Sequence, residues 1–335
     1  MTGARPQGTL FWKYVVFLVG LVGGLLIASG LVELYFSYQE AKLALVRLER
    51  EKALVAAERI ESFVKDIERQ LRATTYAASD DPAVAPSARK GGGFRETLAG
   101  ALIEQRELDF LRFLRSVPAA RDVRHLDIAG KEQLRVSRFA LDAVGSGEDF
   151  SRSAAFLEAK KSGKSYFSPV YFHNDSEPYM TIAVPSGEYA VEVTVAEVSL
   201  KAIWDVVSRI RVGQLGHAYV VDARGNLIAH PDVSLVLQKR DLSDLAQVRE
   251  ARAESKVSDA DETRVMIARG LDGGQVLAAH APINPLQWIV FVEQPLAEAF
   301  APLQASVLRG AIILVLGLAL AVLASVVLAR RMVAP

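Results

Sequence analysis

The stretch AYVVDARGNLIAHPD, residues 218–232, has the pattern of a β-hairpin: an apolar run, an Asp-x-x-Gly turn and a second apolar run. The earlier stretch LDIAGKEQLRVS, residues 126–137, has the same order, with Asp127 in the place of Asp222. We interpret the pair as an internal duplication of a mixed module of roughly 95 residues. The alternative is two unrelated hairpins that share common turn chemistry.

The segments that follow each hairpin support the duplication, because they come in the same order. After the first hairpin we predict two strands, SYFSPVYF and EPYMTIAVP, about the turn HNDS, then the alternating strand YAVEVTVAEV and the helix LKAIWDVVSRI. After the second we predict a helix, LSDLAQVREARAE, and then three strands, TRVMIARG, GQVLAAHAPI and QWIVFVEQP. Alternation in these short strands indicates antiparallel sheets and therefore an α+β fold.

Two apolar segments flank this region, YVVFLVGLVGGLLIASGLV at 14–32 and GAIILVLGLALAVLASVVLA at 310–329, and neither contains a charge. Each has about the 20 residues that a helix needs to cross a bilayer. We expect two transmembrane helices, at 14–36 and 310–329. The alternatives are a cleaved signal peptide for the first and a buried core helix for the second.

The charges beside these segments predict their orientation. Arg5 and Lys13 precede the first segment, and Arg330 and Arg331 follow the second. Because basic residues favour the cytoplasmic side, both termini are expected in the cytoplasm and residues 37–309 outside.

A long amphipathic helix is expected after the first span, because residues 37–78 contain neither proline nor glycine and place apolar residues at helical spacing. Near the membrane this helix also fits a coiled coil between two subunits. Two prolines and three glycines in residues 79–93 predict a loop, and the helical pattern resumes at 94–116.

This arrangement resembles the double Cache sensor region of bacterial transmembrane receptors. Three stretches carry the resemblance: SYFSPVYFHNDSEPYMTIAVP, LKAIWDVVSRIRVGQLGHAYVVDARGNLIAHPD and WIVFVEQPLAEAF. It covers essentially the whole chain, and the terminal LARRMVAP resembles the start of a HAMP linker, with Pro335 as its early proline. The resemblance implies two tandem PAS-like Cache modules on a long N-terminal helix.

The resemblance also divides the chain. The expected parts are a cytoplasmic N-terminus 1–13, transmembrane helix 14–36, long helix 37–78, loop and helix 79–117, membrane-distal module 118–214, membrane-proximal module 215–296, connecting helix 297–309, transmembrane helix 310–329 and HAMP-like start 330–335.

In function, the resemblance implies a non-catalytic sensor. The distal module of such receptors binds a small molecule, and the proximal module passes the change through the second span to a cytoplasmic output. We expect a homodimer in the bacterial inner membrane, with a histidine kinase as output; a nucleotide cyclase, a cyclic-dinucleotide enzyme or a chemoreceptor rod are alternatives. Binding would act by shifting populations between two arrangements.

Candidate ligand contacts lie on neighbouring strands of the first module. Residues two apart on a strand share a face, so the strand pair about HNDS presents Tyr171 with His173 and Tyr179 with Thr181. Arg135 or Arg152 would bind a carboxylate. Arg152 matches the arginine of amino-acid-binding modules, but DFSRSAAFLEA lacks their tryptophan and tyrosine, which counts against an amino acid. The alternative for each residue is plain surface decoration.

Composition excludes several other functions. The chain has no cysteine, so thiolate catalysis and cysteine zinc sites are ruled out. Its formal net charge is zero, and we expect no nucleic-acid partner. The histidines lack metal-ligand spacing, no nucleophile motif is present, and we expect no metal or cofactor. An anchored metal-dependent hydrolase using Asp222, His230 and Asp232 is one competing hypothesis; a ligand-independent dimer spacer is another.

Overall fold

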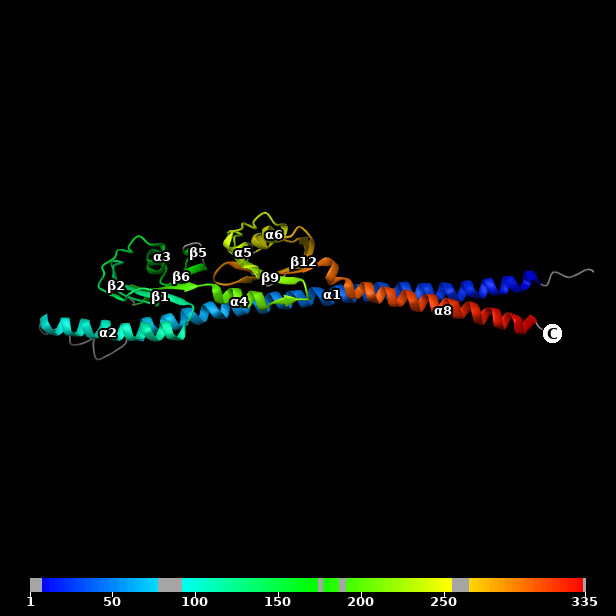
Figure 1. Ribbon diagram of the computed structural model, residues 1–335, viewed down its shortest axis with the longest axis horizontal. Helices are drawn as coiled ribbons and strands as arrows, with labels where there is room; N and C mark the ends of the chain where they lie inside the picture. The colour runs from blue at the N-terminus through cyan, green and yellow to red at the C-terminus, as the bar shows by residue number, and fades with distance from the viewer. Residues whose placement is uncertain (1–7, 78–91, 174–176, 187–190, 255–264, 334–335) are drawn as a thin grey trace, which may run out of the picture.

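The computed structural model describes residues 8–77, 92–173, 177–186, 191–254 and 265–333. It is an elongated molecule in which two sheet modules lie on one side of a long helix (Figure 1). The α+β fold with antiparallel sheets on a long N-terminal helix is as predicted.

Helix α1 (Gly8–Ala77) is continuous through the first apolar segment and the amphipathic region. Helix α8 (Ala301–Val333) runs beside its N-terminal half (Figure 1). The two helices pack closely: Tyr38 stacks on Phe300 with ring centroids 6.1 Å apart, and a Cβ added to Gly23 would lie 2.9 Å from Cδ1 of Leu318. The continuous helix therefore joins the apolar end directly to the sheets.

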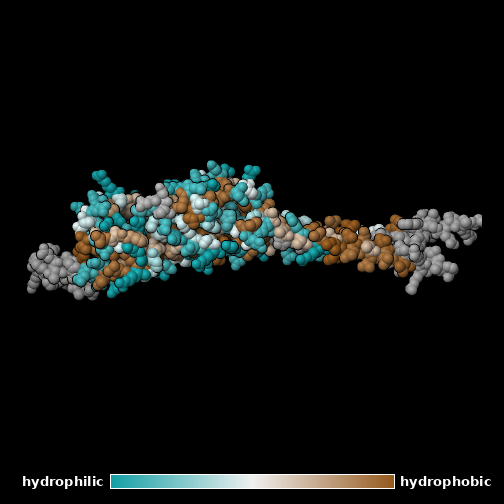
Figure 2. Space-filling view, viewed as in Figure 1, coloured by the Kyte–Doolittle hydropathy of each residue, from teal (hydrophilic) through white to brown (hydrophobic). Residues whose placement is uncertain are grey.

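An apolar zone covers the paired ends of α1 and α8 (Figure 2). Within the described part of the chain, one window is long and apolar enough to cross a membrane, Val307–Ala324 in α8. The expected span at 14–36 stays a prediction. So does the HAMP-like start, since α8 ends at Val333 and residues 334–335 lie outside the described residues.

The first module is a seven-stranded antiparallel sheet with two helices. Its strands, in order, are β3 (Ala143–Val144), β2 (Glu132–Ser137), β1 (Ala120–Leu126), β7 (Glu192–Ser199), β6 (Glu177–Ser186) and β4 (Tyr166–Phe167), with β5 (Tyr171–His173) also on β6. Along the chain, helix α2 (Gly92–Ser116) precedes the first strand, and α3 (Ala154–Ser162) comes between β3 and β4. The predicted strand SYFSPVYF is split into β4 and β5, because Pro169 lies between them and lacks the N–H that a ladder needs.

The second module is a six-stranded antiparallel sheet. Its strands, in order, are β10 (Leu227–Ala229), β9 (Gly216–Val221), β13 (Trp288–Pro295), β12 (Gln275–Ile283) and β11 (Val265–Arg269), with β8 (Arg211–Val212) also on β9. Its helices are α4 (Lys201–Arg209), α5 (Val233–Leu237), α6 (Ala246–Glu254) and α7 (Leu296–Ala299). Helix α7 is followed at once by α8, so the sheet is linked directly to the second apolar helix.

Alternation along the strands gives the first sheet two different faces. Met180, Ile182 and Val184 of β6 belong to the core formed with α1. Ala183 and Val195 belong instead to a smaller core under α3. The face turned away from α1 is therefore available for a site beneath α3.

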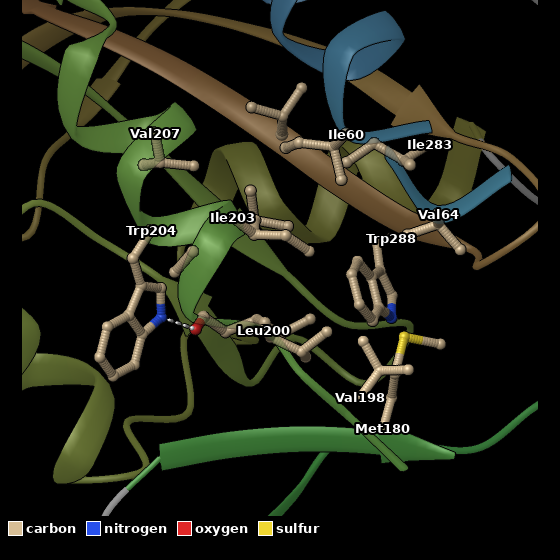
Figure 3. Close-up of a cluster of buried hydrophobic side chains, with 14 of the residues drawn as sticks. Ile60, Val64, Met180, Val198, Leu200, Ile203, Trp204, Val207, Ile283 and Trp288 are labelled. Carbon is tan, nitrogen blue, oxygen red and sulfur yellow. Dashed lines mark hydrogen bonds between the residues drawn. The ribbon is translucent and has the colours of Figure 1, made fainter. Parts of the chain in front are cut away.

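One hydrophobic cluster joins α1 to both modules, and we call it the junction cluster (Figure 3). Its members are buried and come from α1, the first sheet, α4 and the second sheet: Ile60, Val64, Met180, Val198, Leu200, Ile203, Trp204, Val207, Ile283 and Trp288. The indole N–H of Trp204 donates to the carbonyl of Ile228 at 2.9 Å. Because these residues form one core, the modules do not pack independently of α1.

The two repeated turns have the same structure. In each, Oδ1 of the aspartate, Asp127 or Asp222, accepts bonds from backbone N–H groups two and four residues later, at 2.8 and 2.9 Å. The glycines, Gly130 and Gly225, have φ of 80° and 101°. Asp222 therefore acts as a turn residue, as predicted.

Replacing Gly130 by alanine should destabilise the first module by about 1–3 kcal/mol, through strain at positive φ and a clash with the backbone. A Cβ at Gly130 would lie 2.6 Å from Cα of Ser151. Gly145 is the matched control, because its φ is also positive, at 63°, but a Cβ there meets nothing within 4 Å. Denaturant unfolding of the detergent-purified chain measures both; equal losses for Gly130→Ala and Gly145→Ala would contradict the expectation.

Candidate functional site

A cavity of about 260 Å³ lies in the first module on the sheet face turned away from α1. Strands β1, β5, β6 and β7 form its floor, and the segment leading into α3 covers it. The lining residues are Asp122, Arg124, Leu126, Phe150, Ser153, Ala155, Tyr171, Thr181, Val195 and Glu197. A few polar groups among apolar walls are typical of a small-molecule site.

The polar centre of the cavity is Glu197 on β7. Its Oε1 accepts a hydrogen bond from the hydroxyl of Tyr171 at 2.6 Å, and that hydroxyl lies 3.2 Å from Oγ1 of Thr181. Burial first, and then the hydrogen bond to Glu197, raise the pKa of Tyr171 well above its usual value. Tyr171 therefore stays a neutral donor that holds Glu197 in place.

A charged pair, Asp122 and Arg124, lies beside Glu197. Nη2 of Arg124 is 3.1 Å from Oδ1 of Asp122, and the Arg124 guanidinium lies 4.9 Å from the centre of the Phe150 ring. The aromatic ring fixes the guanidinium plane against the wall. Nε of Arg121, which does not line the cavity, is 3.5 Å from Oε2 of Glu197. The lining thus contains two carboxylates and one guanidinium.

Of the six predicted site residues, Tyr171 and Thr181 line the cavity. His173 and Tyr179 form a layer beside it: their rings are 6.3 Å apart, and the ring of Tyr179 lies 6.4 Å from that of Tyr171. Nη2 of Arg121 is 3.3 Å from Nε2 of His173. The turn HNDS falls largely outside the described residues.

The two predicted arginines do not line the cavity. Arg135 on β2 is the cross-strand partner of Arg124, so it lies one strand further from the centre of the sheet. Arg152 is exposed on the segment before α3. Arg124 occupies the place that we expected for one of them.

Sequence reasoning missed Asp122, Arg124 and Glu197. The alternation of YAVEVTVAEV carried a usable signal, because Glu197 falls on the same face as Val193 and Val195, where a charge is unusual. Asp122 and Arg124 alternate in the same way on β1. They meet Glu197 only because β1 pairs with β7, which lies far along the chain.

The family model described as Cache domain matches residues 29–303. The chain belongs to the Cache domain family. Solved Cache-type sensor structures share the fold at low identity. The sensory domain of the Campylobacter jejuni chemoreceptor Tlp3 is 12% identical with a TM-score of 0.61, covering 79% of this chain and 98% of that one.

Two further structures match the Cache region in the same way. The extracellular domain of the putative histidine kinase mmHK1S-Z2 is 15% identical with a TM-score of 0.56, over 78% of this chain and 99% of that one. The Pseudomonas aeruginosa PAO1 chemoreceptor PctB, solved with L-Gln, is 18% identical with a TM-score of 0.51, over 76% and 93%. No curated protein matches the sequence.

A buried histidine gives the first module a predicted sensitivity to acid. Nε2 of His125 is 3.2 Å from Glu192, yet burial and, after it, the charge of Arg106 lower the pKa of His125 to about 3. A pKa below the value of an unfolded chain makes protonation favour unfolding, so the stabilisation is complete above about pH 6.5 and is lost as pH falls toward 3.

His125→Gln should reduce the loss of unfolding free energy between pH 8 and pH 4 by a few kcal/mol, because glutamine does not ionise. Free energies of unfolding measured between pH 8 and pH 4, each variant referred to its own value at pH 8, give the comparison. Parallel curves for the two proteins would show that His125 is not the responsible group.

Proposed function

We propose that this chain is the extracytoplasmic sensing region of a transmembrane receptor and binds a small molecule with an ammonium group in the distal cavity. The observation that carries the proposal is that two carboxylates, Asp122 and Glu197, line the cavity with only one guanidinium, Arg124, while Arg121 contacts Glu197 from outside the lining. An ammonium group with free N–H donors satisfies carboxylate oxygens in a site partly removed from water.

The rest of the lining suits a compact, partly apolar ligand. Leu126, Phe150 and Val195 offer apolar walls, and Arg124 offers a donor fork to a ligand carboxylate. In a zwitterion such as an amino acid, the ammonium group would face the two carboxylates and the carboxylate would face Arg124. The neighbouring Tlp3 structures hold isoleucine and valine, and the PctB structure holds L-Gln, which agrees with this ligand class.

Of the predicted residues, we retain Tyr171 and Thr181 as contacts and replace Arg135 and Arg152 by Arg124. His173 and Tyr179 support the site from the adjoining layer through Arg121, whose guanidinium lies 5.5 Å from the Tyr179 ring centre. Arg121 in turn holds Glu197. These residues position the carboxylate that recognises the ligand.

Signal transfer would use the short path from the second sheet into α8. Backbone N–H groups of Gln214 and Leu215, before β9, both donate to the carboxylate of Glu298 in α7. Helix α7 leads directly into α8. A ligand that fits one arrangement of the modules better would shift the population toward it and move α8 relative to α1.

The wider setting is also part of the proposal. We assign residues 14–36 of α1 and residues 310–329 of α8 as two spans of the inner membrane, with residues 37–309 outside, and expect a homodimer joined along the helices. The output that we favour is a histidine kinase, in keeping with the kinase sensor among the structural neighbours. A chemoreceptor is the alternative favoured by the other neighbours.

A thermal-shift screen of the detergent-purified chain tests the ligand class. Binding to the folded state alone stabilises it by about 2.7 kcal/mol at a hundred times the dissociation constant, enough for a rise of several degrees. We expect rises for amino acids or amines and none for the matching carboxylic acids without nitrogen. A rise for the carboxylic acids alone, or none for any amine, would contradict the proposal.

A further inference from the structure

The second module carries a carboxylate at the position that Glu197 has in the first. Asp122 and Glu197 are cross-strand partners between β1 and β7, and His217 and Glu293 are cross-strand partners between β9 and β13. Asp122 and His217 lie the same number of residues before the aspartate of the repeated turn. By the internal duplication, Glu293 is therefore the counterpart of the proposed ligand-binding carboxylate.

The surroundings of Glu293 differ from those of Glu197, because the chain itself covers it. Glu293 is 0% exposed. Its Oε1 accepts bonds from the hydroxyl of Tyr219 at 2.5 Å and from Nε2 of Gln247, on α6, at 3.0 Å. Its Oε2 is buried and has no hydrogen-bond partner among the described residues. Such an oxygen is costly to leave charged and is readily satisfied by a proton.

Two histidines complete the cluster. The rings of His217 and His230 are 5.0 Å apart at 72°, and Nε2 of each is buried without a hydrogen-bond partner in the described part of the chain. The backbone N–H of Asp232 donates to Nδ1 of His230 at 2.9 Å, which leaves Nε2 to carry the proton in the neutral ring. Burial, and next the charge of His217, lower the pKa of His230 to about 4. His230 is therefore neutral near pH 7.

The other charged groups around the cluster come from neighbouring elements. Asp232 caps α5, and Asp272 lies in the turn between β11 and β12. His280 on β12 is paired with Glu254 of α6 at 3.2 Å. Arg269 of β11 contributes its backbone carbonyl, which accepts a bond from Gln247. The cluster thus joins α6 to three adjacent strands.

We infer that the membrane-proximal module is a proton sensor, in which Glu293, in its cross-strand pair with His217, binds one proton from solvent at the place of the first module's organic ligand. The proton is bound at the buried, unpartnered Oε2 of Glu293, so that this carboxyl is neutral when loaded and negatively charged when empty. The organic ligand and the proton would then bind at equivalent positions of the two modules.

The position of the pair connects it to α8. His217 follows Leu215, whose N–H donates to Glu298 of α7 at 3.0 Å. Glu293 lies two residues before Pro295, the N-cap of α7. Loading the pair with a proton changes the charge between β9 and β13; β13 leads directly into α7, and the turn before β9 is hydrogen-bonded to it.

The direction of the pKa shift agrees with this role. Burial raises the pKa of Glu293, against the hydrogen bonds from Tyr219 and Gln247. A raised pKa means that the folded module binds the proton more tightly than the unfolded chain does. This stabilisation is present at low pH and is lost as pH rises through the folded pKa.

Infrared difference spectra of the full chain in nanodiscs, recorded while pH is lowered, detect the C=O stretch of a buried protonated carboxyl. Glu49 is a second buried carboxyl, and burial raises its pKa to about 7, so every protein in this comparison carries Glu49→Gln. On this background we expect the band in the otherwise unaltered chain and in the control Glu148→Gln, an exposed position in the first module, and its loss in Glu293→Gln. A band that persists in Glu293→Gln would overturn the inference.

Because the chain has no cysteine, spin labels at Glu40→Cys and Leu308→Cys report the α1–α8 distance alone, with unlabelled chain added to suppress contacts between subunits. The distance distribution should change with pH in wild type and not in Glu293→Gln. No change with pH in wild type would overturn the coupling to α8. If Glu293→Gln fails to fold, His217→Asn should raise the midpoint of the infrared titration by about one pH unit, because His217 lowers the pKa of Glu293 against the larger effect of burial; an unmoved or lowered midpoint would overturn the inference.

Discussion

Glu197→Gln should weaken binding of an ammonium ligand by about 10- to 100-fold, because a hydrogen bond to a charged group contributes about 1.5–3 kcal/mol. Glutamine keeps the size of the side chain and still accepts the bond from Tyr171. The substitution removes the negative charge that faces the cavity and, with it, the ion pair between Glu197 and Arg121. Isothermal titration of the best ligand from the screen measures the dissociation constant for both proteins.

Arg152→Ala is the matched control for this substitution. Arg152 is exposed and outside the cavity lining, although the sequence singled it out as a carboxylate partner. We expect its dissociation constant to equal that of wild type. Loss of affinity in Arg152→Ala with full affinity in Glu197→Gln would place the ligand outside the cavity.

Trp288→Ala should cost about 3–5 kcal/mol of unfolding free energy, the range for removal of a large aromatic side chain from a core. Trp288 is 3% exposed and lies in the junction cluster between α1 and the first sheet (Figure 3). Its loss leaves a void at the one core shared by α1 and both modules. Denaturant unfolding of the full chain measures the effect.

Leu141→Ala provides the comparison for Trp288→Ala, since Leu141 is 89% exposed on the first module. Its unfolding free energy should stay within about 0.5 kcal/mol of wild type. A similar small loss for Trp288→Ala would mean that the junction cluster does not hold the modules together.

Much of the fold was predictable because its signals are local. The absence of proline and glycine after residue 36 predicted the continuous helix, and period-two alternation predicted strands such as β7. The repeated Asp-x-x-Gly turns predicted two modules. The two-residue strands β3 and β8 were not predictable, because each is too short to show period-two alternation and is defined only by its pairing with the neighbouring strand, β2 or β9. Helix α3 was missed although Ser153 caps it.

The site was predictable only in part, because topology decides which strands meet. Alternation predicted one shared face for Tyr171 and Thr181, and both line the cavity, because they lie on paired strands joined by one short connection. Residue chemistry alone favoured Arg135 and Arg152, but the cavity lies over β1 and β7, at the centre of the sheet. Arg124 lines the cavity because β1 pairs with β7, and no local sequence pattern predicts that pairing.

The most direct test of the account is a crystal structure of the sensing region with the ligand found by the screen. We predict density for the ligand in the distal cavity, with its ammonium nitrogen within hydrogen-bond distance of Glu197 or Asp122. Ligand density elsewhere on the molecule, with only water beside Glu197, would contradict the account.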